Sequence, residues 1–281
     1  MGHIRTTRKA MRQMYRAITM SAALVLLAST AGAEGAKPLT KCAPDAVVSG
    51  TVCMDTYEAS VWRVPAPATL NKRLVTKIQK GKATALDLAN GGATQLGVAS
   101  DDYAPCADSG QNCADDIYAV SLPSVTPSSF ITWFQAQAAC ENSRKRLPSN
   151  AEWQVGAAGT PDPGPDDETD DCNTSGPPFA VTATGSRSAC TSTRGAFDMV
   201  GNLYEWVADW VPRSTTCGTW SAGVSPTGDD QCLAGAGTTG EPGALLRGGN
   251  FGGGSSAGPL TVRGDIELSF AVNFFGFRCA R

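Results

Sequence analysis

The stretch GNLYEWVADW, Gly201 to Trp210, places two carboxylates and three large aromatic rings within ten positions. Carboxylate oxygens are the hard ligands that calcium prefers, whereas large aromatic side chains supply much of the apolar area of a core. This stretch therefore either lines a ligand site or braces a core, and the residues elsewhere in the chain must decide between the two.

The only histidine of the 281 residues, His3, lies in a segment that we expect to be removed. The sequence predicts a signal peptide over 1–33. Its N-terminal part is basic and has no acidic residue, an apolar run follows over 22–28, and small residues at 31–33 form a cleavage pattern. A membrane anchor is the alternative, but the run is shorter than the roughly 20 residues that cross a bilayer. Without histidine, the mature chain cannot form a Ser-His-Asp or Cys-His catalytic site. It also cannot bind zinc or iron through histidine.

Cleavage at this point leaves 18 basic against 26 acidic side chains, a net charge of −8. An acidic surface repels phosphate backbones, so we expect no nucleic-acid partner. The predicted product is exported to the periplasm or the extracellular space and is not embedded in a membrane.

Ten cysteines, all after the predicted cleavage site, are typical of an oxidising compartment. Their spacing favours local disulfides and leaves two cysteines that are far apart, although spacing alone cannot fix connectivity. The predicted local pairs are Cys42 with Cys53, Cys106 with Cys113, Cys172 with Cys190, and Cys217 with Cys232, which leaves Cys140 and Cys279.

Regular elements are sparse in a chain with 31 glycines and 17 prolines. Two capping boxes predict helices over 133–142 and 151–158, and the polar, turn-rich stretch 64–128 is interpreted as a loop-rich surface insertion. The rest of 34–281 is predicted to form one domain.

Four segments resemble the formylglycine-generating enzyme family, also called sulfatase-modifying factors. The first is the N-terminal block from Cys53 to Ser60; the others are TWFQAQAACENSRKRLPSNAEWQVGAAG, RGAFDMVGNLYEWVADW, and LLRGGN followed by NFFGFRCAR. The resemblance implies an α+β fold, a C-type-lectin-like variant with a twisted antiparallel sheet and two main helices. It also implies that Cys140 and Cys279 form a disulfide.

In this family the turn before the aromatic pair holds a calcium ion. The resemblance therefore implies a calcium site made of Asp198, the carbonyl oxygens of Gly201 and Leu203, and Glu205. The alternative is that Asp198 caps a turn and Glu205 pairs with an arginine. In either case we expect Trp206 and Trp210 to belong to the core.

The resemblance also implies that this chain lacks the metal ligands of the active family members. Active members bind copper(I) through two cysteines that follow the RGGS motif, and the aligned positions here are Gly253 and Gly258, with Asn250 in place of the serine. Because glycine offers no sulfur and copper(I) requires soft ligands, we expect neither copper nor iron.

We therefore interpret the chain as a non-catalytic, exported scaffold that binds a peptide, an envelope protein or a glycan. A groove beside the glycine-rich loop is the expected site, although this loop could simply connect two strands. The candidate lining residues are Asn250, Phe251, Arg263, Asp265, Asn273 and Phe274. Two alternatives stay open: a formylglycine-generating oxidase with unrecognised metal ligands, and a lectin that binds sugar through the turn calcium.

Overall fold

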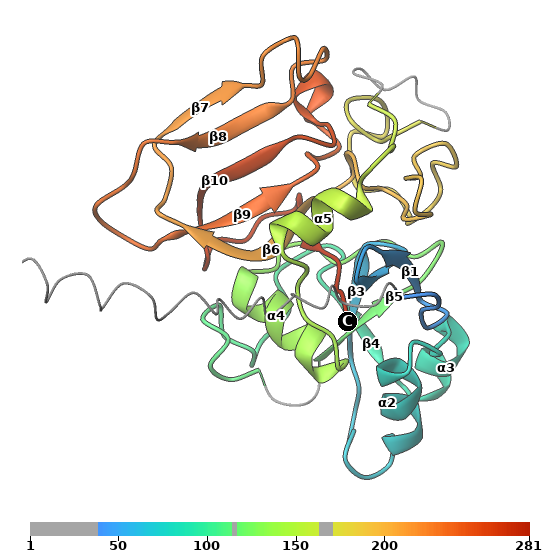
Figure 1. The fold of residues 1–281 in the computed structure, drawn as a ribbon. Coiled ribbons are helices and arrows are strands. Elements are labelled where there is room, and N and C mark those ends of the chain that lie inside the picture. The colour runs from blue at the N-terminus through green and yellow to red at the C-terminus, as the bar shows by residue number, and fades with distance from the viewer. Residues whose placement is uncertain (1–38, 114–116, 163–170) are drawn as a thin grey trace, which may run out of the picture. The chain divides into compact units, whose positions relative to one another are not determined.

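The computed structural model describes residues 39–113, 117–162 and 171–281 (Figure 1). The predicted signal peptide lies outside these ranges and stays a prediction. In the described ranges, none of the helices combines the length and the apolar composition that a membrane span requires.

The described residues form strands, four α-helices and one short 3-10 helix. The strands are β1 (Ala46–Ser49), β2 (Val52–Asp55), β3 (Ala59–Arg63), β4 (Thr94–Leu96), β5 (Ile117–Ser121), β6 (Tyr204–Val211), β7 (Thr216–Thr219), β8 (Asp230–Ala234), β9 (Gly243–Arg247), β10 (Val262–Glu267) and β11 (Phe275–Phe277). The helices are α2 (Lys72–Gln79), α3 (Ala85–Asn90), α4 (Trp133–Asn142), α5 (Asn150–Gly156) and the 3-10 helix η1 (Gly254–Ser256).

The largest sheet has the strand order β11-β6-β9-β10-β8-β7, and its outer strands β7 and β8 are visible at one side of Figure 1. The pairs β11–β6 and β10–β8 are parallel, whereas β6–β9, β9–β10 and β7–β8 are antiparallel. β9 is buried along its whole length because it lies in the middle of this sheet. The sheet thus brings the turn before β6 and the closing motif at β11 next to each other.

The segment 64–128 is more regular than the predicted loop-rich insertion. It contributes β4 and β5 to a three-stranded sheet of order β4-β3-β5 and also contains α2 and α3. Leu74 and Ile78, one turn apart on α2, are buried in a cluster with Leu88 and Tyr118. The apolar side chains on one face of α2 therefore belong to a second, smaller core.

Both predicted main helices are confirmed, together with their caps. Thr132 accepts the N–H of Gln135 at the start of α4, and Ser149 accepts the N–H of Glu152 at the start of α5. In each case the side chain of the third helical residue accepts the N–H of the capping residue in return. These reciprocal bonds satisfy orphan donors of the first turn and fix where each helix begins.

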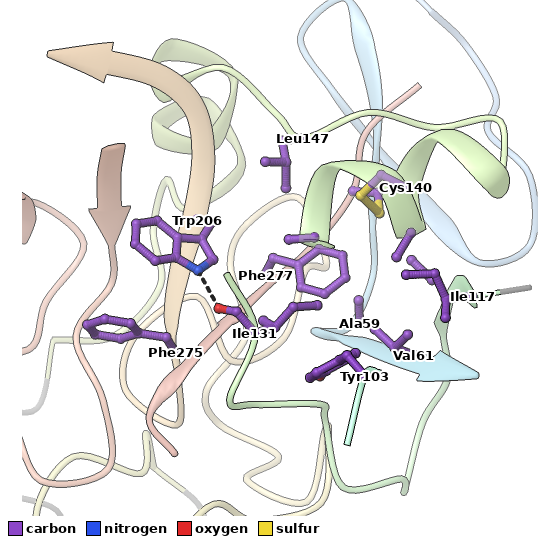
Figure 2. Close-up of a cluster of buried hydrophobic side chains, with 14 of the residues drawn as sticks. Ala59, Val61, Tyr103, Ile117, Ile131, Cys140, Leu147, Trp206, Phe275 and Phe277 are labelled. Carbon is purple, nitrogen blue, oxygen red and sulfur yellow. Dashed lines mark hydrogen bonds between the residues drawn. A yellow bond between two sulfur atoms is a disulfide. The ribbon is translucent and has the colours of Figure 1, made fainter. Parts of the chain in front are cut away.

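The main core packs α4 against β3, β5, β6 and β11, and Figure 2 shows its central side chains. Trp206 is fully buried, and its indole N–H donates to the carbonyl oxygen of Ile131 at 3.0 Å. The prediction for Trp210 is wrong, because half of its side chain is exposed. The register between β6 and β9 shifts between these two tryptophans, and the second half of β6 reaches the surface.

All five predicted disulfides are present, including the long one between Cys140 and Cys279 (Figure 2). The C-terminal residues lie against the N-terminal hairpin, since Cys53 and Arg281 exchange two backbone hydrogen bonds of 2.8 Å. The α+β class, with few helices and mostly antiparallel strands stapled by disulfides, is thereby confirmed.

Candidate functional site

The turn that precedes β6 has an unusual backbone. Asp198, Gly201 and Asn202 all have positive φ, at 57°, 72° and 56°. A Cβ on Gly201 would lie 2.2 Å from the carbonyl oxygen of Asn173, so only glycine fits there. The turn thus holds two non-glycine residues in the left-handed region, which the surrounding contacts must stabilise.

A buried arginine provides most of these contacts. Arg278 directly follows β11. Its guanidinium donates to both carboxylate oxygens of Glu205 at 2.6 to 2.9 Å. It also donates to the carbonyl oxygens of Phe197 at 2.8 Å and of Asp55 at 3.2 Å. The indole N–H of Trp153 gives Glu205 a further hydrogen bond of 2.6 Å. A guanidinium therefore sits at the centre of this turn and joins it to β2.

Two of the predicted calcium ligands, Glu205 and Asp198, already have hydrogen-bond partners in this arrangement. Both oxygens of Glu205 receive N–H groups, and a positive charge already lies against them. Asp198 directs one oxygen to the N–H of Gly185 at 2.7 Å. This pairing matches the alternative that the sequence left open for Glu205. Calcium at the turn stays a prediction, which the melting experiment described in the Discussion tests.

A second buried carboxylate, Glu58, links the turn to a neighbouring loop. Glu58 accepts the N–H of Leu203 at 3.0 Å and a hydrogen bond from the side chain of Asn202. The carbonyl oxygen of Asn202's side chain in turn accepts the N–H of Thr182 at 2.8 Å and the amide of Asn173 at 2.9 Å. Asn202 therefore holds the loop 173–182 in place beside the turn.

The buried carboxylates make stability depend on pH. Burial raises the pKa of Asp198 from 3.8 to about 7, although the N–H of Gly185 and the guanidinium of Arg278 act in the opposite direction. Burial also raises the pKa of Glu58. Because the folded protein holds these protons more tightly than the unfolded chain, both groups stabilise the fold most at low pH. The contribution of Asp198 is complete below about pH 4 and is lost as the pH rises to about 7.

We therefore expect Asp198→Asn to flatten the pH dependence of unfolding. The asparagine keeps an oxygen for the N–H of Gly185 but cannot ionise, so the wild type should lose up to about 1.4 kcal/mol per pH unit more than the variant between pH 4 and 7. Urea unfolding at each pH measures both proteins. Parallel pH profiles for the two proteins would contradict the raised pKa.

A cavity of about 260 Å³ lies beside the loop that Asn202 holds. Its walls come from five separate segments of the chain, and they combine aromatic and aliphatic side chains with polar groups. The lining residues are Val98, Ala99, Thr126, Ser129, Phe130, Phe179, Ala180, Val181, Phe251 and Asn273. Phe130 and Phe179 both have positive φ, at 54°, and Phe179 is 63% exposed at this cavity.

The structure brings two of the six predicted lining residues, Phe251 and Asn273, to this cavity. Phe251 is anchored there because its N–H donates to the carbonyl oxygen of Asn202 at 3.0 Å. The side chain of Asn250 instead accepts the N–H of Gly252 at 2.7 Å. Phe274 packs edge-on against the ring of Phe275, with ring centroids 5.0 Å apart.

Arg263 and Asp265, the other two predicted lining residues, pair with each other on β10 and are not among the residues at the cavity. The cavity residues that the sequence did not indicate are Phe130, Phe179 and their neighbours. Their segments carry no recognisable motif, so only the fold shows that they meet.

The two glycines at the aligned cysteine positions have different surroundings. A Cβ on Gly253 would lie 3.0 Å from that of Ala257, whereas a Cβ on Gly258 would lie 2.4 Å from the carboxylate of Asp229. Asp229 is fully buried and accepts hydrogen bonds from Ser225 at 2.6 Å and from the N–H of Leu260 at 2.7 Å. A carboxylate held in place by its neighbours therefore fills the space that a side chain at 258 would need.

The chain belongs to the sulfatase-modifying factor family. The model for the "Sulfatase-modifying factor enzyme 1-like domain" matches residues 97–281, which include the turn, the cavity and the closing motif. This membership confirms the resemblance of the sequence motifs.

Curated relatives match a much shorter part of the chain. The serine/threonine-protein kinases Pkn1 of Chlamydia trachomatis serovar L2 and pkn1 of Chlamydia pneumoniae are 35% and 34% identical to it over 85 residues. This match covers 28% of the chain and only 13% of each kinase.

Solved structures with a similar arrangement have low sequence identity. The structure of PvdO from Pseudomonas aeruginosa is 18% identical, with a TM-score of 0.43, and the match covers 84% of this chain and 82% of PvdO. The Major Tropism Determinant P3c variant is also 18% identical, with a TM-score of 0.45, over 84% of this chain and 52% of that protein.

Proposed function

We propose that this chain is a non-catalytic recognition scaffold that acts after export, in the periplasm or outside the cell. The observation that carries the proposal is the cavity beside Phe251 and Asn273, which aromatic and aliphatic side chains line together with polar groups. A concave apolar surface with a few polar groups is the usual form of a binding site.

The chemistry of the cavity favours a peptide or an exposed protein segment. Its aromatic and aliphatic walls suit an apolar side chain, and Phe179 at the cavity can pack against such a group. The exposed side chain of Asn273 forms no hydrogen bond within the described ranges, so its amide can pair with a peptide group of the ligand. Recognition of a glycan is an outcome of the test below.

The cysteines argue against the family's oxidase chemistry. All ten are paired in disulfides, so the folded and oxidised chain offers no thiolate to copper(I). The aligned positions 253 and 258 are glycines, and Asp229 fills the space next to the second. The alternative function, which family membership suggests, is a formylglycine-generating oxidase with unrecognised metal ligands.

Peptides selected from a random library by the purified protein test the proposal. We expect Phe251→Ala and Asn273→Ala each to weaken binding of the best peptide at least tenfold, about 1.4 kcal/mol, because both residues line the cavity. Fluorescence titration measures the dissociation constants. Phe270→Ala is the matched control, since Phe270 is 49% exposed and does not line the cavity.

Equal losses for Phe251→Ala and Phe270→Ala would place binding elsewhere on the surface. Selection of glycans on an array, with no peptide selected, would replace the peptide by a sugar ligand. The oxidase is tested separately with copper(I), oxygen and a Cys-x-Pro-x-Arg peptide. A mass change from thiol to aldehyde in the peptide would overturn the non-catalytic assignment.

A further inference from the structure

The disulfide between Cys217 and Cys232 differs from the other four in its exposure. It joins β7 and β8 at the outer side of the large sheet, and all four residues of β7 are exposed. Cys217 is the only exposed residue among the ten cysteines; the others are buried or half-buried. Since thiol–disulfide exchange requires access to a sulfur atom, this bond is the first that a reductant can reach.

A carboxylate lies next to this disulfide. The two sulfur atoms and a carboxylate oxygen of Asp265 lie within 4.8 Å of one another, and in the described part of the chain no other group of three such ligands meets this condition. Asp265 is two residues after Arg263, which pairs in register with Cys232 between the parallel strands β10 and β8. Strand pairing therefore holds the carboxylate beside the sulfur atoms.

Asp265 is itself oriented by an arginine. Its two oxygens accept hydrogen bonds from Arg263 at 3.1 and 2.7 Å, which leaves a lone pair on each oxygen for a further partner. Carboxylates and histidines that bind metals are commonly held in this way by a second hydrogen-bonding group.

We propose that reduction of the Cys217–Cys232 disulfide creates a zinc site made of the two thiolates and Asp265. A dithiol reductant supplies two electrons and two protons: its own sulfurs form a disulfide, while the bond between Cys217 and Cys232 breaks to give two thiols. Zn²⁺ then binds both sulfurs and displaces their two protons. A water molecule completes the four-coordinate geometry that zinc prefers.

The group stays neutral when the ion replaces the two thiol protons. Two thiolates and Asp265 carry three negative charges, and Zn²⁺ together with Arg263 carries three positive charges. Thiolate sulfur also selects zinc over calcium and magnesium, which require oxygen ligands. The oxidised protein has no such site, so metal binding would report the redox state of this disulfide.

The experiment treats the folded protein with a limited amount of a water-soluble phosphine and alkylates the free thiols. Peptide mapping should find the label at Cys217 and Cys232 first. The reduced protein, without alkylation, should then bind one equivalent of zinc in competition with a chromogenic chelator. We expect Asp265→Asn to weaken zinc binding at least tenfold and Cys217→Ser/Cys232→Ser to abolish it.

Glu267→Gln is the matched control, because Glu267 lies on the same strand but pairs with Arg213. Its zinc affinity should stay within twofold of the wild type. Cobalt(II) in the reduced wild type should give a thiolate charge-transfer band, which reports sulfur ligation even if a variant folds poorly. Prior reduction of another disulfide, absence of zinc binding, or equal affinity in Asp265→Asn would each overturn the proposal.

Discussion

Arg278→Met should lower the free energy of unfolding by about 3–5 kcal/mol, because it leaves the carboxylate of Glu205 buried without its counter-charge. Both side chains are at most 1% exposed, so water cannot replace the lost hydrogen bonds. The carbonyl oxygens of Asp55 and Phe197 lose their donors as well. Urea unfolding followed by circular dichroism measures the difference.

The double variant Arg278→Met/Glu205→Gln should regain part of this loss, since it removes both charges. Arg263→Met is the matched control: its ion pair with Asp265 is partly exposed, so a loss of at most about 1 kcal/mol is expected. An Arg278→Met protein as stable as this control would show that the guanidinium does not hold the turn.

The wild type and the single variant Glu205→Gln test the predicted calcium ion. If Arg278 supplies the positive charge at the turn, the melting temperature of the wild type should be the same in calcium and in a chelator. A melting temperature that rises with calcium, and no longer does so in Glu205→Gln, would instead support the predicted ligand set.

The second large effect is expected from the disulfide between Cys140 and Cys279, which are 139 residues apart in sequence. Removing both sulfurs with Cys140→Ala/Cys279→Ala should cost about 5 kcal/mol, because the unfolded chain regains the entropy of a long loop. Both residues are fully buried in the main core, so small packing losses add to this value. Thermal and urea unfolding of the oxidised proteins measure it.

Cys217→Ala/Cys232→Ala serves as the comparison. These residues are 15 apart in sequence, for which the same entropy argument gives a loss of about 3 kcal/mol. If the two double variants lose the same stability, loop length does not determine the effect in this protein.

The parts of the fold that the sequence predicts are those specified by neighbouring residues. Thr132 with Gln135 and Ser149 with Glu152 form capping boxes whose four residues determine the helix start by themselves. The family motifs supplied the pairing of Cys140 with Cys279. The capping boxes depend on neighbouring residues and the disulfide on family motifs, so both could be predicted from the sequence.

The contacts that the sequence did not predict join distant segments. Arg278 was part of a recognised motif, but nothing in that motif shows that its guanidinium reaches Glu205, 73 residues earlier. The spacing of Leu74 and Ile78 indicates a helix, yet the many turn residues around it led us to expect loops. The sequence also gives no sign of the register shift in β6, and the prediction that Trp210 lies in the core failed for this reason.

The cavity is the clearest case of this limit. Phe251, beside the glycine-rich loop, and Asn273, in the closing motif, could be proposed from the sequence, whereas Phe130 and Phe179 come from segments without a motif. Their left-handed backbone conformation is also not expected for phenylalanine and depends on the tertiary contacts around them.

The pairing of Cys53 with Arg281 has a consequence for how the molecule is made. A ribosome delivers a polypeptide from its amino end, so the β1–β2 hairpin emerges more than two hundred residues before the segment that pairs with it. Until that late partner arrives, the edge of β2 stays open. Complete pairing of β2 must therefore wait until Arg281 has been synthesised.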